Sequence, residues 1–95
     1  MILTPLVVRK KYPNFEIEEC MDFQRLGITG IANRALDGLE KLQELWLNNN
    51  KISNIANRDF KGLKNLQELY LEENKITNEQ KEELTKALPN VNIYF

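Results

Sequence analysis

The stretch LQELWLNNNKI, at residues 42–52, is followed by LQELYLEENKI at residues 66–76, and the two differ at three positions. The likeness extends backwards, because ANRALDGL at residues 32–39 is similar to ANRDFKGL at residues 56–63. In both cases the spacing is 24 residues. The sequence therefore contains two consecutive copies of one unit.

Weaker copies of the unit flank these two. One period before the first full copy, Met21 and Phe23 occupy two of its leucine positions, and Leu26 replaces its asparagine. One period after the second full copy, Ile93 and Phe95 occupy the same leucine positions. Terminal units of a stack are often atypical because they also cap it. We therefore expect two full repeats between two degenerate ones.

Alternating residues within each copy predict a strand. Leu45 and Leu47 alternate with Trp46, and this period of two places the leucines toward a core and the indole outward. Residues 53–66 then return the chain over the core and contribute further apolar side chains. One copy cannot cover its own apolar face, whereas stacked copies place their strands side by side in a short parallel sheet.

The pattern L-x-x-L-x-L-x-x-N-x-I in a unit of this length resembles the leucine-rich repeat, and the resemblance covers the chain from about Phe15 to its end. It implies an α/β fold, a leucine-rich repeat solenoid with a short parallel sheet on the concave face and loops or short helices on the convex face. It also implies that the concave face is used for protein recognition.

Asn50 and Asn74 occupy equivalent positions, and their fixed spacing invites interpretation as ligands or catalytic amides. A turning backbone, however, leaves buried N–H and C=O groups unpaired, and an inward-facing asparagine can pair with both kinds of group. In leucine-rich repeats this ladder is structural. We therefore interpret Asn50 and Asn74 as a structural ladder.

The C-terminal residues 77–95 depart from the repeat and predict a capping helix followed by a last strand at residues 91–95. Thr77 and Gln80 form a capping-box pattern, and Pro89 is expected to end a helix of about ten residues. The apolar face of this helix is expected to contain Leu84, Ala87 and Leu88.

The N-terminal part is divided at residue 15. Residues 1–14 are expected to form an N-terminal cap or arm, because the first eight are mostly apolar. The repeats then occupy residues 15–76, and FEIEECMDF at residues 15–23 is expected to form the first strand. The side chains expected to point together from it are Ile17, Met21 and Phe23.

The composition argues against catalysis and cofactor binding. The chain of 95 residues has no histidine, so it lacks the usual general base near neutral pH and the commonest zinc ligand. The four glycines form no phosphate-binding loop. Glu44 and Glu68 are equivalent acids, but on an open face they are expected to remain ordinary carboxylates. We predict no enzyme, no cofactor and no metal site.

Charge and cysteine content limit the partners and the compartment. The formal net charge of -1 argues against nucleic-acid binding, and no stretch is apolar enough for a membrane span. Cys20 is the only cysteine, so an intramolecular disulfide is impossible. The N-terminus does not have the charge order of a secretory signal. We expect a single domain in the cytoplasm.

The outward strand positions contribute nothing to the core and are the candidate binding residues. At the repeat spacing, Trp46, Tyr70 and Tyr94 form an aromatic column that continues to Asp22, and carboxylates border it. Such aromatics either stabilise the sheet by cross-strand contact alone or also form a binding hot spot for a protein with a basic or mixed surface. Pairing of copies through the sheet edges, giving a homo-oligomeric scaffold, is the alternative. The predicted binding residues are Trp46, Tyr70, Tyr94, Glu44, Glu68, Asn48, Glu72 and Asp22.

Overall fold

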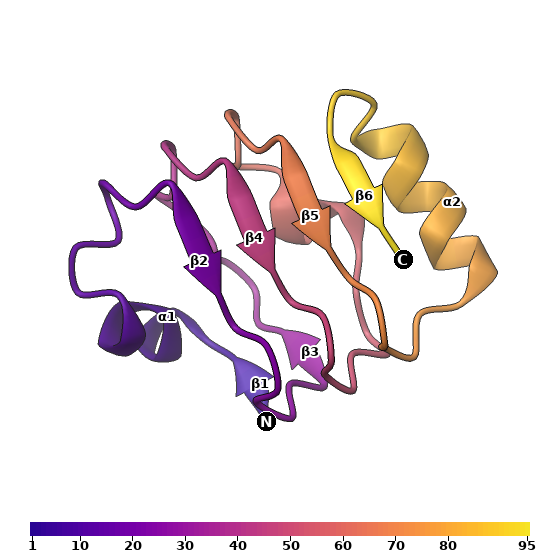
Figure 1. Ribbon diagram of the computed structural model, residues 1–95, viewed down its shortest axis with the longest axis horizontal. Coiled ribbons are helices and arrows are strands. Elements are labelled where there is room, and N and C mark those ends of the chain that lie inside the picture. Colours follow the sequence, from indigo (N-terminus) through magenta and orange to yellow (C-terminus); the bar gives the residue numbers. More distant parts are fainter.

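The computed structural model describes residues 1–95, and its main element is a parallel four-stranded sheet in the order β2-β4-β5-β6. The strands are β2 (Cys20–Asp22), β4 (Glu44–Trp46), β5 (Glu68–Tyr70) and β6 (Asn92–Tyr94), and Figure 1 shows them side by side in chain order. Each strand is one repeat further along the chain than its neighbour, so that Leu45 is paired with Leu69 and Leu69 with Ile93.

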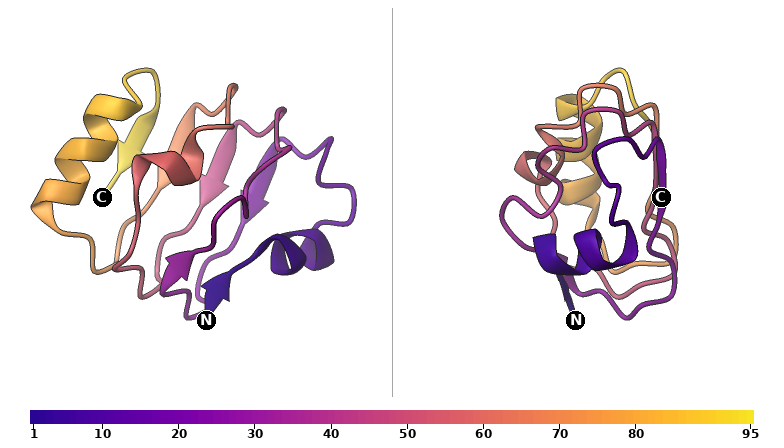
Figure 2. Two further views of the ribbon diagram at one scale, coloured as in Figure 1. Left: turned by 180° about the vertical axis from the view of Figure 1, so that it is seen from behind. Right: turned by 90° about the vertical axis from the view of Figure 1, so that its left-hand side faces the viewer.

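The core lies between this sheet and the returning segments on the convex side. It contains 19 buried hydrophobic residues, and Leu45, Leu69 and Phe60 are each at most 1% exposed. Phe60 ends a short 3-10 helix, η1 (Asn57–Phe60), which lies behind the sheet together with the C-terminal helix (Figure 2). The alternation of exposed and inward residues along each strand separates the core from the outward-facing positions.

A second, two-stranded sheet is formed by β1 (Ile2–Leu3) and β3 (Gly30–Ile31), which the sequence analysis did not predict. Gly30 also forms a bridge to Asn54, one repeat later. A Cβ atom at Gly30 would lie 3.3 Å from the Asn54 carbonyl oxygen, so glycine permits this close backbone approach. Leu3 is fully buried, and the first residues therefore belong to the packed structure.

The N-terminal helix α1 (Pro5–Lys11) covers one end of the core. It begins with local signals, because the Thr4 hydroxyl accepts a hydrogen bond from the Val7 N–H and Pro5 occupies the first turn. Val8 is its buried residue. Immediately after the helix, the Tyr12 hydroxyl accepts a hydrogen bond from the Asp22 N–H at 2.7 Å and donates one to the Asp22 carbonyl at 3.4 Å. This hydroxyl thereby pairs with both backbone groups of Asp22 at the outer edge of β2.

The prediction for Ile17 is wrong. Met21 and Phe23 are fully buried as expected, but Ile17 is 62% exposed because it lies in a turn rather than in the first strand. Its N–H donates to the Asn14 carbonyl, which closes the turn before the strand starts at Cys20. The alternation in this segment was imperfect, and the turn interrupts it.

The C-terminal helix α2 (Asn78–Ala87) starts with a capping box in which Thr77 and Gln80 exchange side-chain and backbone hydrogen bonds. Gln80 also donates to the Ser53 carbonyl and so fastens the helix to the preceding repeat. Leu84 is buried, but Ala87 is exposed, contrary to the expected apolar face. We retain residues 1–14, 15–76 and 77–95 as a proposed division of the chain.

The turn after each of the first three sheet strands contains a residue in the left-handed conformation. Arg25, Asn49 and Glu73 have φ angles of 57°, 59° and 57° and are related by the repeat spacing. Of these, only asparagine adopts this conformation at low cost. The stacking of the repeats therefore imposes the turn regardless of the residue present.

Candidate binding face

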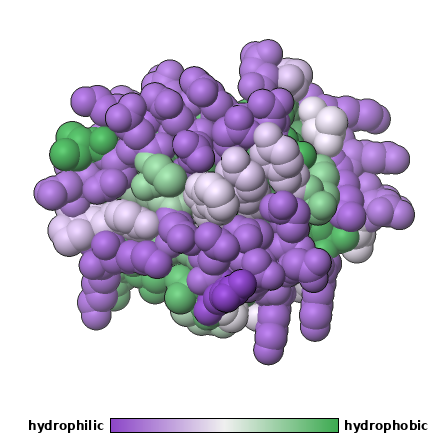
Figure 3. Space-filling view, in the orientation of Figure 1, coloured by the Kyte–Doolittle hydropathy of each residue, from purple (hydrophilic) through white to green (hydrophobic).

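Three aromatic rings are stacked across the concave sheet face; we call Trp46, Tyr70 and Tyr94 the aromatic strip. The ring centroids of Trp46 and Tyr70 are 4.1 Å apart, and those of Tyr70 and Tyr94 are 4.7 Å apart. The interplanar angles of 18° and 11° show nearly parallel stacking. In Figure 3 the face has a pale central band bordered by hydrophilic atoms.

The stacking follows directly from the parallel register. Trp46 is paired with Tyr70 and Tyr70 with Tyr94, and neighbouring parallel strands lie about 4.8 Å apart, which is close to the stacking distance of aromatic rings. Both faces of the Tyr70 ring are covered by its neighbours. The outer ring faces of Trp46, toward β2, and of Tyr94, toward the edge of the sheet, therefore have no aromatic neighbour, and we call them the open faces.

Carboxylates border the aromatic strip. Asp22 is paired with Trp46 across β2 and β4, and it is exposed, with its Oδ1 accepting a hydrogen bond from the Gln24 N–H. Glu44 and Glu68 are paired with each other on one side of the strip. Glu72 lies on the other side, and all three glutamates are half-buried.

Several of these polar groups have buried atoms without partners. Glu68 Oε2 and Glu72 Oε1 are covered by neighbouring atoms but have no hydrogen-bond donor. Asn48 donates from its Nδ2 to Gln24 Oε1, whereas its own Oδ1 is also buried without a partner. Buried polar atoms are usually hydrogen-bonded, so these three oxygens are exceptions within this face.

Burial and the neighbouring carboxylates together raise the pKa values of three groups on this face. Partial burial and then the charge of Glu68 raise the pKa of Tyr70. Interaction of the Tyr94 hydroxyl with the Glu68 side chain, together with burial, raises the pKa of Tyr94. Partial burial and then Glu44 raise the pKa of the Cys20 thiol, while its contact with Trp46 acts in the opposite direction.

Asn50 and Asn74 lie on the other side of the strands from this face. Asn50 accepts hydrogen bonds from the Leu26 and Ile28 N–H groups and donates to the Phe23 and Leu47 carbonyls. Asn74 accepts from the Ile52 N–H and donates to the Leu47 and Leu71 carbonyls. Each asparagine thus links its own turn to the preceding repeat.

The eight predicted binding residues are brought together by the sheet, since all of them form or border the aromatic strip. Cys20 was not among the predicted binding residues, although its thiol contacts Trp46 and the residue is exposed. Its position one repeat before Glu44 was the signal that placed it on this face.

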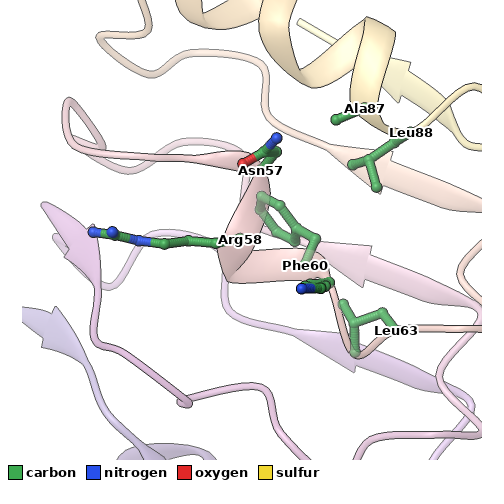
Figure 4. A pocket seen from close by; sticks show the side chains of 7 residues that line it. Asn57, Arg58, Phe60, Leu63, Ala87 and Leu88 are labelled. Carbon is green, nitrogen blue, oxygen red and sulfur yellow. The ribbon is translucent and has the colours of Figure 1, made fainter.

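A separate groove of about 420 Å³ lies on the convex side between η1 and the end of α2. Figure 4 shows Phe60 and Leu63 on one side of it and Ala87 and Leu88 on the other, with Arg58 at the rim. The groove has an apolar floor and basic side chains and contains no carboxylate or thiol. Nowhere in the structure are three or more acidic, histidine or cysteine side chains grouped as metal ligands.

Comparison with known proteins identifies the family. Residues 23–76, more than half of the chain, match the sequence model of the leucine rich repeat family. The chain belongs to the leucine-rich repeat family. The α/β leucine-rich repeat solenoid predicted from the sequence is thereby confirmed. Domains of this family generally act as protein-interaction modules rather than as enzymes.

A solved structure of a leucine-rich repeat protein from Leptospira interrogans is similar to this leucine-rich repeat chain, with 35% sequence identity and a TM-score of 0.64. The match covers 72% of this chain and 17% of the Leptospira protein, so the chain spans only a small part of that protein's length. A search of curated protein sequences finds no match. None of the helices has the length and apolar character that crossing a bilayer requires.

Proposed function

We propose that this leucine-rich repeat chain is a non-enzymatic module that binds a protein partner on its concave sheet face. The observation that carries the proposal is the aromatic strip, whose side chains lie outside the core and are held in register by the sheet. Trp46 and Tyr70 are the proposed anchors. The proposed surround consists of Tyr94, Glu44, Glu68, Asn48, Glu72 and Asp22.

The physical chemistry of the strip supports binding. Tryptophan and tyrosine are enriched in interface hot spots because they bury a large area while losing little conformational entropy. Here the mutual stacking restricts the rings before any partner arrives, which lowers the entropic cost of association. The carboxylate border favours a partner with a basic or mixed surface.

The test is a pull-down from a soluble extract with three forms of the protein. Wild type is compared with the double variant Trp46→Ala, Tyr70→Ala and with Arg58→Ala, Lys61→Ala, a control that shortens two exposed side chains on the convex side. Circular dichroism checks that each form is folded. A protein retained by wild type and the control but lost from the Trp46 and Tyr70 variant supports the proposal, and equal retention by all three forms contradicts it.

A second candidate function is self-association through the outer edge of β6. The Asn92 N–H and the Tyr94 carbonyl bond to the β5 side, which leaves the peptide groups of Ile93 facing outward. The opposite edge of the sheet is occupied by Tyr12. A strand edge with unpaired groups is a template for a further strand, and a second copy of the chain would supply one.

Light scattering over a range of concentrations tests this candidate. The variant Phe95→Lys places a charge beside the β6 edge and is expected to abolish a dimer formed there, whereas Trp46→Ala is expected to spare it. Deletion of residues 91–95 gives the same expectation where the shortened chain remains folded. A monomeric wild type at every concentration eliminates the candidate. The cytoplasmic location expected from the sequence remains a prediction.

A further inference from the structure

The charged side chains at the outward strand positions of the concave face are all acidic. The outward strand positions, together with Gln24, Asn48 and Glu72 just after the strands, contain no lysine or arginine. They contain four carboxylates, which belong to Asp22, Glu44, Glu68 and Glu72. Because the whole chain has a formal net charge of only -1, the remainder of the molecule is net positive. The negative charge is therefore concentrated where the aromatic strip lies, and it will attract cationic groups to that face.

The open face of Trp46 is the position on the strip best suited to a cation. The other face of the indole is covered by Tyr70, while the side toward β2 has Asp22 as its register partner. Glu44 projects from the same strand as Trp46, two residues earlier and therefore on the same face. Tryptophan gives the strongest cation–π attraction, and two carboxylates beside it add charge pairing.

Glu68 and Glu72 provide a second anionic position about one strand further along. They lie on the two sides of Tyr70 and are half-buried, so part of each side chain stays accessible on the concave face. A planar guanidinium has five N–H donors, so it can approach such carboxylates while satisfying more than one acceptor. In an extended peptide, side chains two residues apart lie about 7 Å from each other on one face, a spacing that falls between one and two strand separations of about 4.8 Å.

We propose that the concave face binds an extended segment of its partner with the pattern Arg-x-Arg, one guanidinium stacking on the open face of Trp46 between Asp22 and Glu44 and the other pairing with Glu68 and Glu72. This inference rests on the proposed function and specifies the chemistry of the partner. Lysine fits less well, because its ammonium neither stacks on an indole as a plane nor pairs with a carboxylate through two parallel hydrogen bonds.

Trp46 is the only tryptophan in the chain, so its fluorescence reports binding at the proposed position directly. The probes are three synthetic peptides with blocked ends: Gly-Arg-Gly-Arg-Gly, the same peptide with lysine, and the same peptide with citrulline, which is the uncharged analogue of arginine. Each is titrated into the full chain at low ionic strength. We expect the arginine peptide to change the Trp46 emission with the highest affinity and the citrulline peptide to have the lowest.

Variants that remove one charge locate the site. Asp22→Asn, Glu44→Gln and Glu68→Gln are each expected to weaken binding of the arginine peptide about two- to fivefold, as partly exposed ion pairs do. Glu83→Gln removes an equal charge from an exposed position on α2 and is expected to leave the affinity unchanged. Added salt is expected to weaken binding of the arginine peptide most.

The inference is overturned if the citrulline or lysine peptide binds as tightly as the arginine peptide, or if Glu83→Gln weakens binding as much as Asp22→Asn. Its failure is distinguishable from failure of the proposed function. A partner protein lost from the Trp46→Ala, Tyr70→Ala variant, together with an arginine peptide that does not bind, retains the binding face and rejects the Arg-x-Arg specificity.

Discussion

Trp46 and Tyr70 lie face to face, one repeat apart in sequence and 4.1 Å apart between ring centroids. Both rings project from outward strand positions, so neither reaches into the core, and truncating them tests stacking separately from core packing. We expect a double-mutant cycle with Trp46→Ala and Tyr70→Ala to give a coupling of about 0.5–1.5 kcal/mol in the free energy of unfolding. Urea denaturation of the four proteins measures it, and a coupling of zero would show that the rings are merely adjacent.

The two ladder asparagines are not equivalent, and their removal is expected to have unequal effects. Asn50 is 9% exposed and accepts two backbone hydrogen bonds, whereas Asn74 is more exposed and accepts one. We expect Asn50→Ala to lower the free energy of unfolding by about 2–4 kcal/mol and Asn74→Ala by about 1–2 kcal/mol, because buried backbone groups lose their partners.

Chemical denaturation of the Asn50 and Asn74 variants, with the exposed Asn33→Ala as control, checks this order. Equal losses for Asn50→Ala and Asn74→Ala would mean that water replaces the lost hydrogen bonds equally well in both turns.

The reactivity of the Cys20 thiol is expected to depend on the negative charge of Glu44 at the β2 end of the face. Partial burial and the negative charge of Glu44 raise the pKa of its thiol, so less reactive thiolate is present at a given pH than in an ordinary exposed cysteine. We expect Glu44→Gln to lower this pKa and to accelerate alkylation by iodoacetamide between about pH 7 and pH 9. The pH profile of the rate measures the shift, and Glu83→Gln again serves as the control. An unchanged profile for Glu44→Gln would contradict the proximity of the two groups.

Gly38 and Gly62 are related by the repeat but differ in backbone conformation. Gly38 has a φ of 83°, whereas Gly62 is outside the left-handed region and would place an added Cβ in open space. We expect Gly38→Ala to destabilise the fold by about 1–2 kcal/mol. Gly62→Ala is expected to stabilise it by about 0.4–1 kcal/mol, because alanine restricts the unfolded chain. Thermal unfolding of the two variants measures both effects. Melting temperatures that shift in the same direction in Gly38→Ala and Gly62→Ala would contradict the prediction.

The repeat made most of the sheet predictable. In a parallel stack of equal units, contacts depend on one sequence spacing, so the pairing of Leu45 with Leu69 follows from aligning the copies. The alignment also placed the degenerate strands, because Met21 and Ile93 take the same register. The outward column of aromatics could be predicted for the same reason.

The remaining features depend on contacts that have no periodic signature. The two-residue strands β1 and β3 are too short to show alternation. Helix α1 had local signals, Thr4 before Pro5, that the sequence analysis did not use. The prediction for Ile17 was wrong because an apolar pattern contains no signal for a turn closed by a single backbone hydrogen bond. The burial of the unpaired Glu68 and Glu72 oxygens depends on how closely neighbouring side chains cover them, and a sequence pattern contains no signal for that.

The Tyr12 hydroxyl offers the first strand both an acceptor and a donor, as the peptide group of another strand would. A strand added before β2 would have to displace this hydroxyl, whereas the β6 edge can accept a further repeat. Each inserted repeat would lengthen the sheet by about 4.8 Å and add one outward ring position to the aromatic strip. The reach of the proposed binding face is thus adjustable in discrete steps, without a change to α1 or Tyr12.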